Sequence, residues 1–374
     1  MSFRWAVNLY FFINGVIFAS WAARLPRLQE DFALDNRLLG FILLSHSIGA
    51  FIAMPITGWL INVKGSRFVT RVSGYLFPFF FIAIPFVPER LLVFVPFFLM
   101  GVAVGLMDVA MNAQAVEVEK QVGKPIMTMF HALFSIGMVV GGMAGSLFIS
   151  MDVSLAHHFV IIGICGFMIL MVAAGYLYPD VIQANEEEEV VFALPNGPLV
   201  GLGIIAFCCM MGEGAMSDWS TNYMKHIVGS TKDFHAFGLI GFAAMMTFGR
   251  LLGDKGRALY GDRSMMLAGA VFSLLGIALI LSLFHPILVI IGFGMVGLGL
   301  ANIVPIVFSL AGSFPDIKPG MGIAMATTIG YAGFMFGPPM IGFLADMYDL
   351  RVALGLIALL FIIMTCLVYR YKPS

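Results

Sequence analysis

The stretch Gly105-Leu-Met-Asp108-Val-Ala-Met-Asn112 sets an acid and an amide inside an otherwise apolar run. Its opening returns in the second half of the chain as Gly299-Leu-Ala-Asn302. Three further echoes share the same long spacing, and they pair Ser20-Trp21 with Asp218-Trp219, 137–141 with 333–337, and 51–65 with 242–256. The chain therefore reads as two homologous halves. Duplicated membrane halves with a polar site at the repeat interface are typical of secondary transporters.

The composition restricts the class of protein. Of the 374 residues, 60% are hydrophobic and only 11% are charged, which a soluble domain could not bury but a lipid bilayer accepts. The net charge of −1 gives no electrostatic case for binding nucleic acid. The four cysteines lie in apolar runs without the spacing of metal ligands or disulfides, so neither a metal nor a cofactor is expected.

Apolar stretches of about 20 residues between short polar breaks predict an all-α protein with twelve membrane spans, six in each half. We expect an N-terminal bundle over 1–178, a cytoplasmic linker over 179–198 with four glutamates at 186–189, and a C-terminal bundle over 199–374. The distribution of Lys and Arg favours cytoplasmic termini in a bacterial inner membrane. The spans are expected near 4–23, 38–60, 69–87, 91–116, 126–149, 156–178, 199–223, 236–253, 264–284, 286–312, 320–345 and 350–370.

Two related motifs follow the second and eighth spans. They read Gly58-Trp-Leu-Ile-Asn62-Val-Lys64-Gly65-Ser-Arg67 and Gly249-Arg250-Leu-Leu-Gly253-Asp254-Lys255-Gly256-Arg257. In each we expect a glycine to close the helix and basic residues to form a tight turn at the cytoplasmic interface. These motifs resemble the loop motif of the major facilitator superfamily, and the resemblance covers the whole chain. It implies two pseudo-symmetric six-helix bundles that work by alternating access.

The fourth span resembles the proton-coupled fucose symporter branch of that superfamily, which carries a functional acid followed four residues later by Asn, as Asp108 and Asn112 stand here. Two positions depart from the pattern. Asn62 replaces the usual acid of the first loop motif, which puts the cytoplasmic latch of that half in doubt. Ala22 occupies the place of the branch's second acid on the first span, which weakens any transfer of fucose specificity.

Asp108 is the first candidate for proton coupling. An ionised Asp at bilayer depth costs about 2.5–3.5 kcal/mol or more, so it must face the bundle interior or a wet cavity. Asp108 and Asn112, at i and i+4, should share one helix face. The acid either carries protons and binds solute or pairs structurally with a neighbouring span.

The seventh span supplies Gly212-Glu213-Gly214, followed by Asp218-Trp219. Glu213 lies close to the middle of the predicted helix, and its flanking glycines allow close packing or a helix break. It either couples protons or holds two helices together. Asp218 is expected nearer the outer gate, and Trp219 either stacks on a ring-bearing solute or anchors the helix at the membrane interface.

Two histidines fall inside spans, and either a proton path or ordinary hydrogen bonding accounts for them. His131 is favoured over His46 because it leads into a glycine row at 137–145. The predicted proton-coupling set is Asp108, Glu213 and His131. The predicted solute-binding set is Asn14, Trp21, Asn112, Asp218, Trp219, Asn302 and Tyr331.

The motifs of ATP binding and of membrane-embedded hydrolysis are absent from the sequence, so we predict a carrier and not an enzyme. The leading hypothesis is proton-driven symport of a small organic, sugar-like solute by a monomer. One alternative is proton-driven export of drug-like compounds or metabolites. Another is a membrane sensor that has lost transport, which Asn62 and Ala22 keep open.

Overall fold

The computed structural model describes residues 2–123, 126–179, 198–312 and 319–371. The chain divides into two compact units, Met1–Glu186 and Glu187–Ser374. The predicted linker lies outside the described residues except at its two ends, and so does its acidic run at 186–189. The boundaries proposed for the two bundles from the sequence therefore stay a prediction.

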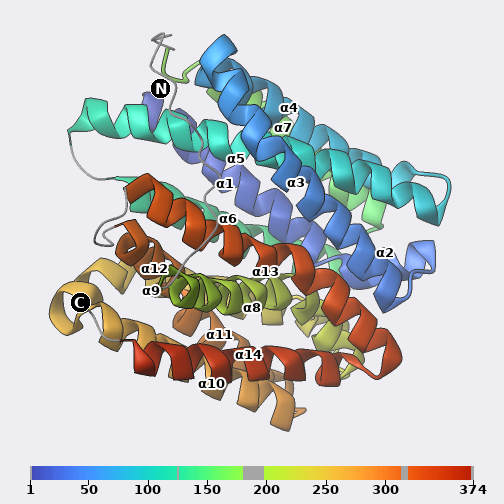
Figure 1. The fold of residues 1–374 in the computed structure, drawn as a ribbon. Helices are drawn as coiled ribbons and strands as arrows, with labels where there is room; N and C mark the ends of the chain where they lie inside the picture. Colours follow the sequence, from blue (N-terminus) through green and yellow to red (C-terminus); the bar gives the residue numbers. More distant parts are fainter. Residues whose placement is uncertain (1, 124–125, 180–197, 313–318, 372–374) are drawn as a thin grey trace. The chain divides into compact units, whose positions relative to one another are not determined.

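The first unit consists of α-helices, drawn from blue to green in Figure 1. Two short 3₁₀ turns, Ile84–Phe86 and Arg90–Val93, separate its third and fourth spans. Its helices are α1 (Phe3–Ala22), α2 (Leu25–Phe32), α3 (Asn36–Lys64), α4 (Ser66–Ala83), α5 (Phe94–Val122), α6 (Met127–Ser150) and α7 (Leu155–Ala174).

The second unit repeats this plan. A 3₁₀ turn at Lys232–Phe234 precedes its second span. Its helices are α8 (Pro198–His226), α9 (Phe237–Tyr260), α10 (Asp262–Ser282), α11 (Pro286–Leu300), α12 (Ile303–Gly312), α13 (Pro319–Met347) and α14 (Leu350–Arg370).

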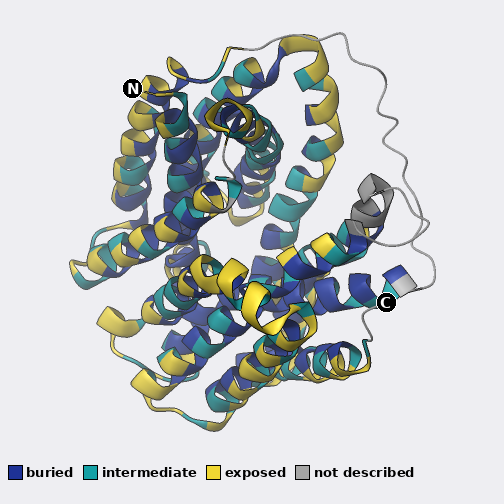
Figure 2. Ribbon diagram, turned by 90° about the vertical axis from the view of Figure 1, so that its left-hand side faces the viewer, coloured by how far each residue is buried: buried dark blue, intermediate teal, exposed yellow. Residues whose placement is uncertain are grey.

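Within the described ranges, twelve segments are long and apolar enough to cross a membrane, which confirms the predicted fold class. Helices such as α3, α7 and α10 bury about a third of their most apolar window, so much of their surface is left for lipid, and Figure 2 shows buried and exposed residues alternating along the ribbons. The prediction of a single helix for the tenth span is wrong. It is interrupted at Ala301 and Asn302, between α11 and α12.

Glycines bring equivalent helices together in both units. A Cβ on Gly137 or Gly141 of α6 would collide with the backbone of α1. A Cβ on Gly333 of α13 would meet the Phe207 carbonyl of α8 in the same way. Without a hydrophobic drive between helices in lipid, this close backbone contact supplies the van der Waals attraction that holds each pair.

The expectation that a glycine of each motif closes its helix is confirmed in the first motif, where Gly65 follows the end of α3, and wrong in the second, whose glycines all lie inside α9. Helix α3 continues past Gly58 to Lys64, and α9 continues past Gly249 and Arg250 through 254–255 to Tyr260. The chain turns at Gly65 and Gly261, whose φ angles of 83° and 77° suit glycine. Gly249 is small for another reason, because a Cβ there would lie 2.7 Å from the Cβ of Ala301 in the tenth span.

Arginines complete the helix ends next to these turns. Arg67 and Arg71 of α4 donate hydrogen bonds to the carbonyls of Gly175 and Ala174 at the end of α7, at 3.2 and 2.8 Å. Arg263 of α10 donates to the Tyr369 carbonyl at the end of α14, at 2.6 Å. A guanidinium at a helix C-terminus satisfies free carbonyls and complements the helix dipole. Arg67 of the first motif and the nearby Arg71 thus contact the end of the sixth span.

Candidate functional site

The first unit places Asp108 at the middle of the unbroken helix α5. The Asn112 amide donates to the Asp108 backbone carbonyl at 2.8 Å and approaches its carboxylate oxygen at 3.5 Å. The predicted shared face is therefore confirmed. Both side chains are only partly buried, so the carboxylate stands at mid-span with an amide as its neighbour on the same helix.

Trp21 lies inside the first unit, in a cluster of rings. Its indole ring centroid is 5.0 Å from that of Phe18, 5.7 Å from that of Phe97 and 5.8 Å from that of His46. Its ring nitrogen has no hydrogen-bond partner among the residues that the structure describes, although it is buried. Asn14, one of the predicted solute-binding residues, is also buried on α1.

An ion pair lies at the centre of the second unit. Nη2 of Arg250 on α9 donates to Oε1 of Glu213 on α8 at 3.2 Å. Both residues lie near the middle of their helices, and about one-fifth of each side chain is exposed. The pairing was not predicted, because Arg250 was assigned to a cytoplasmic turn. Helix α9 continues to Tyr260 and does not end near 253, so Arg250 lies near its middle, where a paired carboxylate lowers the cost of its charge.

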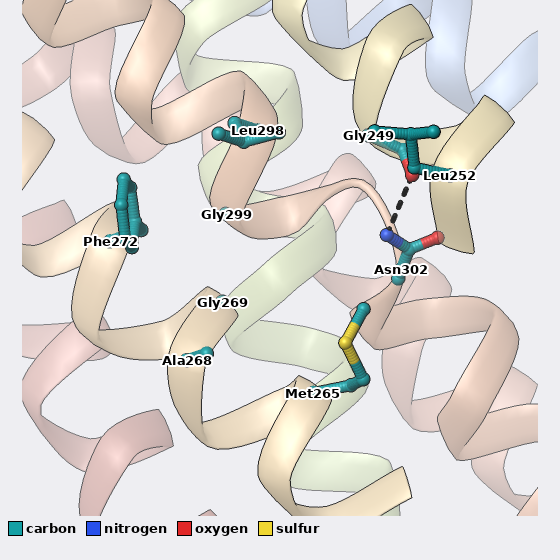
Figure 3. A pocket seen from close by; sticks show the side chains of 9 residues that line it. All are labelled: Gly249, Leu252, Met265, Ala268, Gly269, Phe272, Leu298, Gly299 and Asn302. Carbon is teal, nitrogen blue, oxygen red and sulfur yellow. Dashed lines mark hydrogen bonds between the residues drawn. The ribbon is translucent and has the colours of Figure 1, made fainter. Parts of the chain in front are cut away.

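The interruption of the tenth span lies beside this ion pair. The Asn302 side-chain amide donates to the carbonyl of Gly249, the residue before Arg250, at 2.9 Å (Figure 3). The Cys209 thiol, one helical turn from Glu213 on α8, approaches the Leu300 carbonyl at 3.7 Å. A side chain of α8 and a backbone carbonyl of α9 thus contact the chain at the break, where the backbone leaves regular helical hydrogen bonding.

A cavity of about 160 Å³ opens next to Asn302 between α9, α10 and α11 (Figure 3). Its lining is apolar apart from Asn302, and Leu252 and Phe272 at its edge are exposed. The solute-binding role predicted for Asn302 stays a prediction; in the structure its side-chain amide joins the tenth span to α9.

The polar run of the seventh span extends beyond Asp218-Trp219, the part that was predicted to be functional. Asp218 is 8% exposed and Trp219 is fully buried. Both residues belong to the predicted solute-binding set. The next three residues, Ser220, Thr221 and Asn222, are also fully buried. Their side chains and the Trp219 indole nitrogen have polar atoms without a hydrogen-bond partner within the described chain. Six consecutive polar or indole-bearing residues, 217–222, in an apolar span were the sequence signal for this group, since each buried polar group without a partner is costly.

Two other predicted residues make ring contacts. His131 is exposed on α6, with its ring 5.2 Å from the ring of Phe11. Tyr331 lies on α13 with its ring 6.1 Å from that of Phe334. Arg24, between α1 and α2, is 3% exposed and donates to the Val153 carbonyl at 2.6 Å. Burial lowers the pKa of the Arg24 guanidinium to about 10.

Clusters of three or more metal-ligating side chains do not occur over the part of the chain that the structure describes. Asp108 offers a carboxylate beside an amide, and Glu213 offers one beside a guanidinium.

The sequence matches a known protein family and resembles known membrane proteins. The sequence model of the Major Facilitator Superfamily matches residues 7–259 and 202–374. An uncharacterized MFS-type transporter of Yersinia pestis is 34% identical over 359 residues, covering 95% of this chain and 92% of that protein. The membrane protein MosC of Rhizobium meliloti is 31% identical over 366 residues, covering 96% of this chain and 88% of its own.

Solved structures agree on the fold. A mutant of the nucleoside transporter NupG superposes with a TM-score of 0.81 at 13% identity, covering 99% of this chain and 100% of that one. An inward-facing, occupied bacterial homolog of the human lysosomal transporter Spinster gives 0.74 at 13% identity, covering 99% and 98%. The family match, the transporter relative and the twelve candidate spans show a multi-pass membrane transporter and not an enzyme, as predicted. The chain belongs to the Major Facilitator Superfamily.

Proposed function

We propose that this transporter is a proton-coupled symporter that moves a small organic solute by alternating access of its two six-helix bundles. The observation that carries the proposal is the presence of two carboxylates, Asp108 and Glu213, at the middle of membrane helices. Ionisable groups at this depth are expensive and mark ion or substrate pathways. A carboxylate is also a group that can take up and release a proton during each transport cycle.

The two acids have different surroundings, which supports different roles. Asp108 contacts an amide on its own helix, and Glu213 contacts an arginine on a neighbouring helix. The membership of the fucose symporter branch stays a proposal that rests on Asp108 and Asn112. Cytoplasmic termini, a bacterial inner membrane and a monomeric carrier are likewise proposed.

Proton movement in liposomes tests the proposal. The purified protein is reconstituted with a pH-sensitive dye inside, and sugars, nucleosides and small organic acids are added outside. We expect at least one solute to acidify the lumen, and we expect Asp108→Asn and Glu213→Gln to reduce this proton movement by about 10²-fold or more, as loss of a proton-transfer group does. Glu117→Gln on α5 is the matched control, because its exposed pair with Lys120 contributes little.

Two results would contradict the proposal. Unchanged coupling in both variants would remove Asp108 and Glu213 from the mechanism. Solute that leaves oriented vesicles in exchange for entering protons would favour export instead.

A further inference from the structure

We propose that the cavity beside Asn302 holds part of one acyl chain of a phospholipid, and that the phosphate of this lipid pairs with Lys255. The proposal adds a lipid site to the molecule and does not depend on which solute the protein carries, or in which direction. It is carried by residues of the second unit alone, on α9, α10 and the tenth span.

Small residues create the space. Gly249, Ala268, Gly269 and Gly299 are among the nine residues that line the cavity (Figure 3). A Cβ on Gly269 would collide with the Gly299 carbonyl, so α10 and α11 touch through their backbones beside the cavity. Its volume of about 160 Å³ is close to the roughly 150 Å³ of an apolar cavity that accepts a benzene-sized molecule. A hydrocarbon segment of about six carbon atoms therefore fits.

The lining selects an apolar occupant. Of the nine lining residues only Asn302 has a polar side chain, and its amide nitrogen donates to the Gly249 carbonyl at 2.9 Å. Water in a cavity needs two to four polar partners, and apolar cavities of this size stay dry. A void left empty forfeits the dispersion contacts of the side chains around it. Hydrocarbon is therefore the chemistry that completes this packing.

The mouth of the cavity lies on the surface that lipid covers. Leu252 and Phe272 at its edge are exposed. So are Phe248, one turn before Leu252 on α9, and Leu275, one turn after Phe272 on α10. Large apolar side chains exposed on membrane-spanning helices face the hydrocarbon of the bilayer. An acyl chain is thus the apolar molecule that meets this opening.

A lysine stands where the head group of such a lipid would lie. Lys255 is exposed and follows Leu252 by three residues, so it is a neighbour on the helix surface about 4.5 Å nearer the end of α9. Tyr260, which ends the helix, is 69% exposed, as aromatic residues at the membrane interface are. The flexible stem of Lys255 can follow the apolar surface while its amine reaches the phosphate level.

The charges at this end of α9 and α10 favour an anionic head group. Arg257 is paired with Asp262 at 2.7 Å, so neither is the main attraction for a phosphate. Arg263 donates to the Tyr369 carbonyl. The charged residues of 254–263 carry a net charge of +1, from three basic and two acidic side chains: Lys255, Arg257, Arg263, Asp254 and Asp262. A phosphate that carries one negative charge neutralises this group.

The bound chain would also support the break in the tenth span. Leu298 and Gly299 line the cavity from the last turn of α11, and Asn302 lines it from the break itself. Leu252 and Met265 reach it from α9 and α10. One acyl chain therefore contacts all three spans where regular helical hydrogen bonding is interrupted. Its removal should loosen α12, which follows the break.

Native mass spectrometry of the full-length protein tests the site. Delipidated protein in detergent is titrated with dioleoylphosphatidylglycerol. We expect the wild type to retain one lipid that Ala268→Leu loses, because the larger side chain fills the cavity. Ala278→Leu is the matched control, since Ala278 is also exposed on α10 but lies outside the cavity. Equal numbers of bound lipid in the wild type and Ala268→Leu would overturn the proposal.

The head group is tested separately. Lys255→Gln should weaken binding of this lipid about fivefold, the fold-change for about 1 kcal/mol per basic residue near an anionic surface. Lys64→Gln, at the equivalent exposed position of the first motif, should leave the affinity unchanged. Glycerol phosphate, the head group without a chain, should neither bind nor compete. Competition by glycerol phosphate, or unchanged affinity in Lys255→Gln, would overturn the proposal.

Misfolding of Ala268→Leu is controlled by thermal unfolding with and without the lipid. We expect the variant without lipid to unfold at or above the wild-type temperature, and only the wild type to gain stability when lipid is added. Ala268→Val, which adds less bulk, provides the same comparison. Hydrogen exchange gives the location. Lipid should slow exchange at 303–312 in the wild type alone, and unchanged exchange there, or slowing confined to the first unit, would overturn the proposal.

Discussion

The fourth and tenth spans hold equivalent places in the two repeats, yet they handle polar groups differently. Helix α5 runs unbroken through Asp108, whose neighbour Asn112 belongs to the same helix. The tenth span breaks at the equivalent residue, Asn302, which turns its amide to the Gly249 carbonyl of another helix. A duplicated frame can thus keep an acid on a rigid helix in one half and a helix break at the same place in the other.

The two residues of the ion pair have uncharged counterparts in the first unit. The alignment of Ser20-Trp21 with Asp218-Trp219 places Gly15 opposite Glu213. A side chain at Gly15 would collide with the Phe134 carbonyl of α6, so the tight packing of α1 excludes an acid there. Trp59, opposite Arg250, is 63% exposed. The comparison shows that close helix packing and a mid-span charge compete for one position.

The largest effect should come from separating the ion pair. Arg250→Met should lower the free energy of unfolding by about 3 kcal/mol, at the low end for a broken buried pair, because both side chains are partly exposed. The double variant Arg250→Met/Glu213→Gln should recover most of this loss. Denaturant unfolding in detergent provides the measurement. A double variant no more stable than the single one would mean that the pair does not govern local stability.

Equivalent glycines provide a sharper comparison of the two halves. Gly249→Ala should lower the free energy of unfolding by about 1–3 kcal/mol, because the new methyl group meets Ala301. Gly58→Ala should be neutral or raise it by up to about 1 kcal/mol, since its surroundings are open and Ala favours helix. Thermal unfolding of both variants, side by side, checks the difference. Equal effects would show that the break in the tenth span does not depend on this contact.

The smallest effect concerns the two asparagines. Asn302→Ala removes a hydrogen bond between helices and should lower the free energy of unfolding by about 1 kcal/mol. Asn112→Ala removes only a bond within α5 and adds a better helix former, so it should change the same quantity by less than about 0.5 kcal/mol. Hydrogen exchange at 303–312 should rise in the first variant alone. Increased exchange in both would contradict the distinction.

Periodic apolar length and internal repetition were enough to predict the spans and the fold, because lipid imposes one period and one length on every spanning helix. The shared face of Asp108 and Asn112 was equally predictable, since it depends on contacts within one helix. The partnership of Glu213 with Arg250 was not. In the sequence, a glycine within a basic motif resembles a helix end. In the structure Gly249 packs against Ala301, inside a helix that continues to Tyr260.

The burial of Trp21 and Trp219 has a practical consequence. The chain has four tryptophans, and these two are 2% and 0% exposed, whereas Trp5 and Trp59 are 58% and 63% exposed. Brominated lipids should therefore quench the fluorescence of Trp5 and Trp59 and spare the other two. The residual emission then comes from one indole in each half, at equivalent places in the repeat. Without any added label, the protein carries an optical reporter of what happens in its interior during a transport cycle.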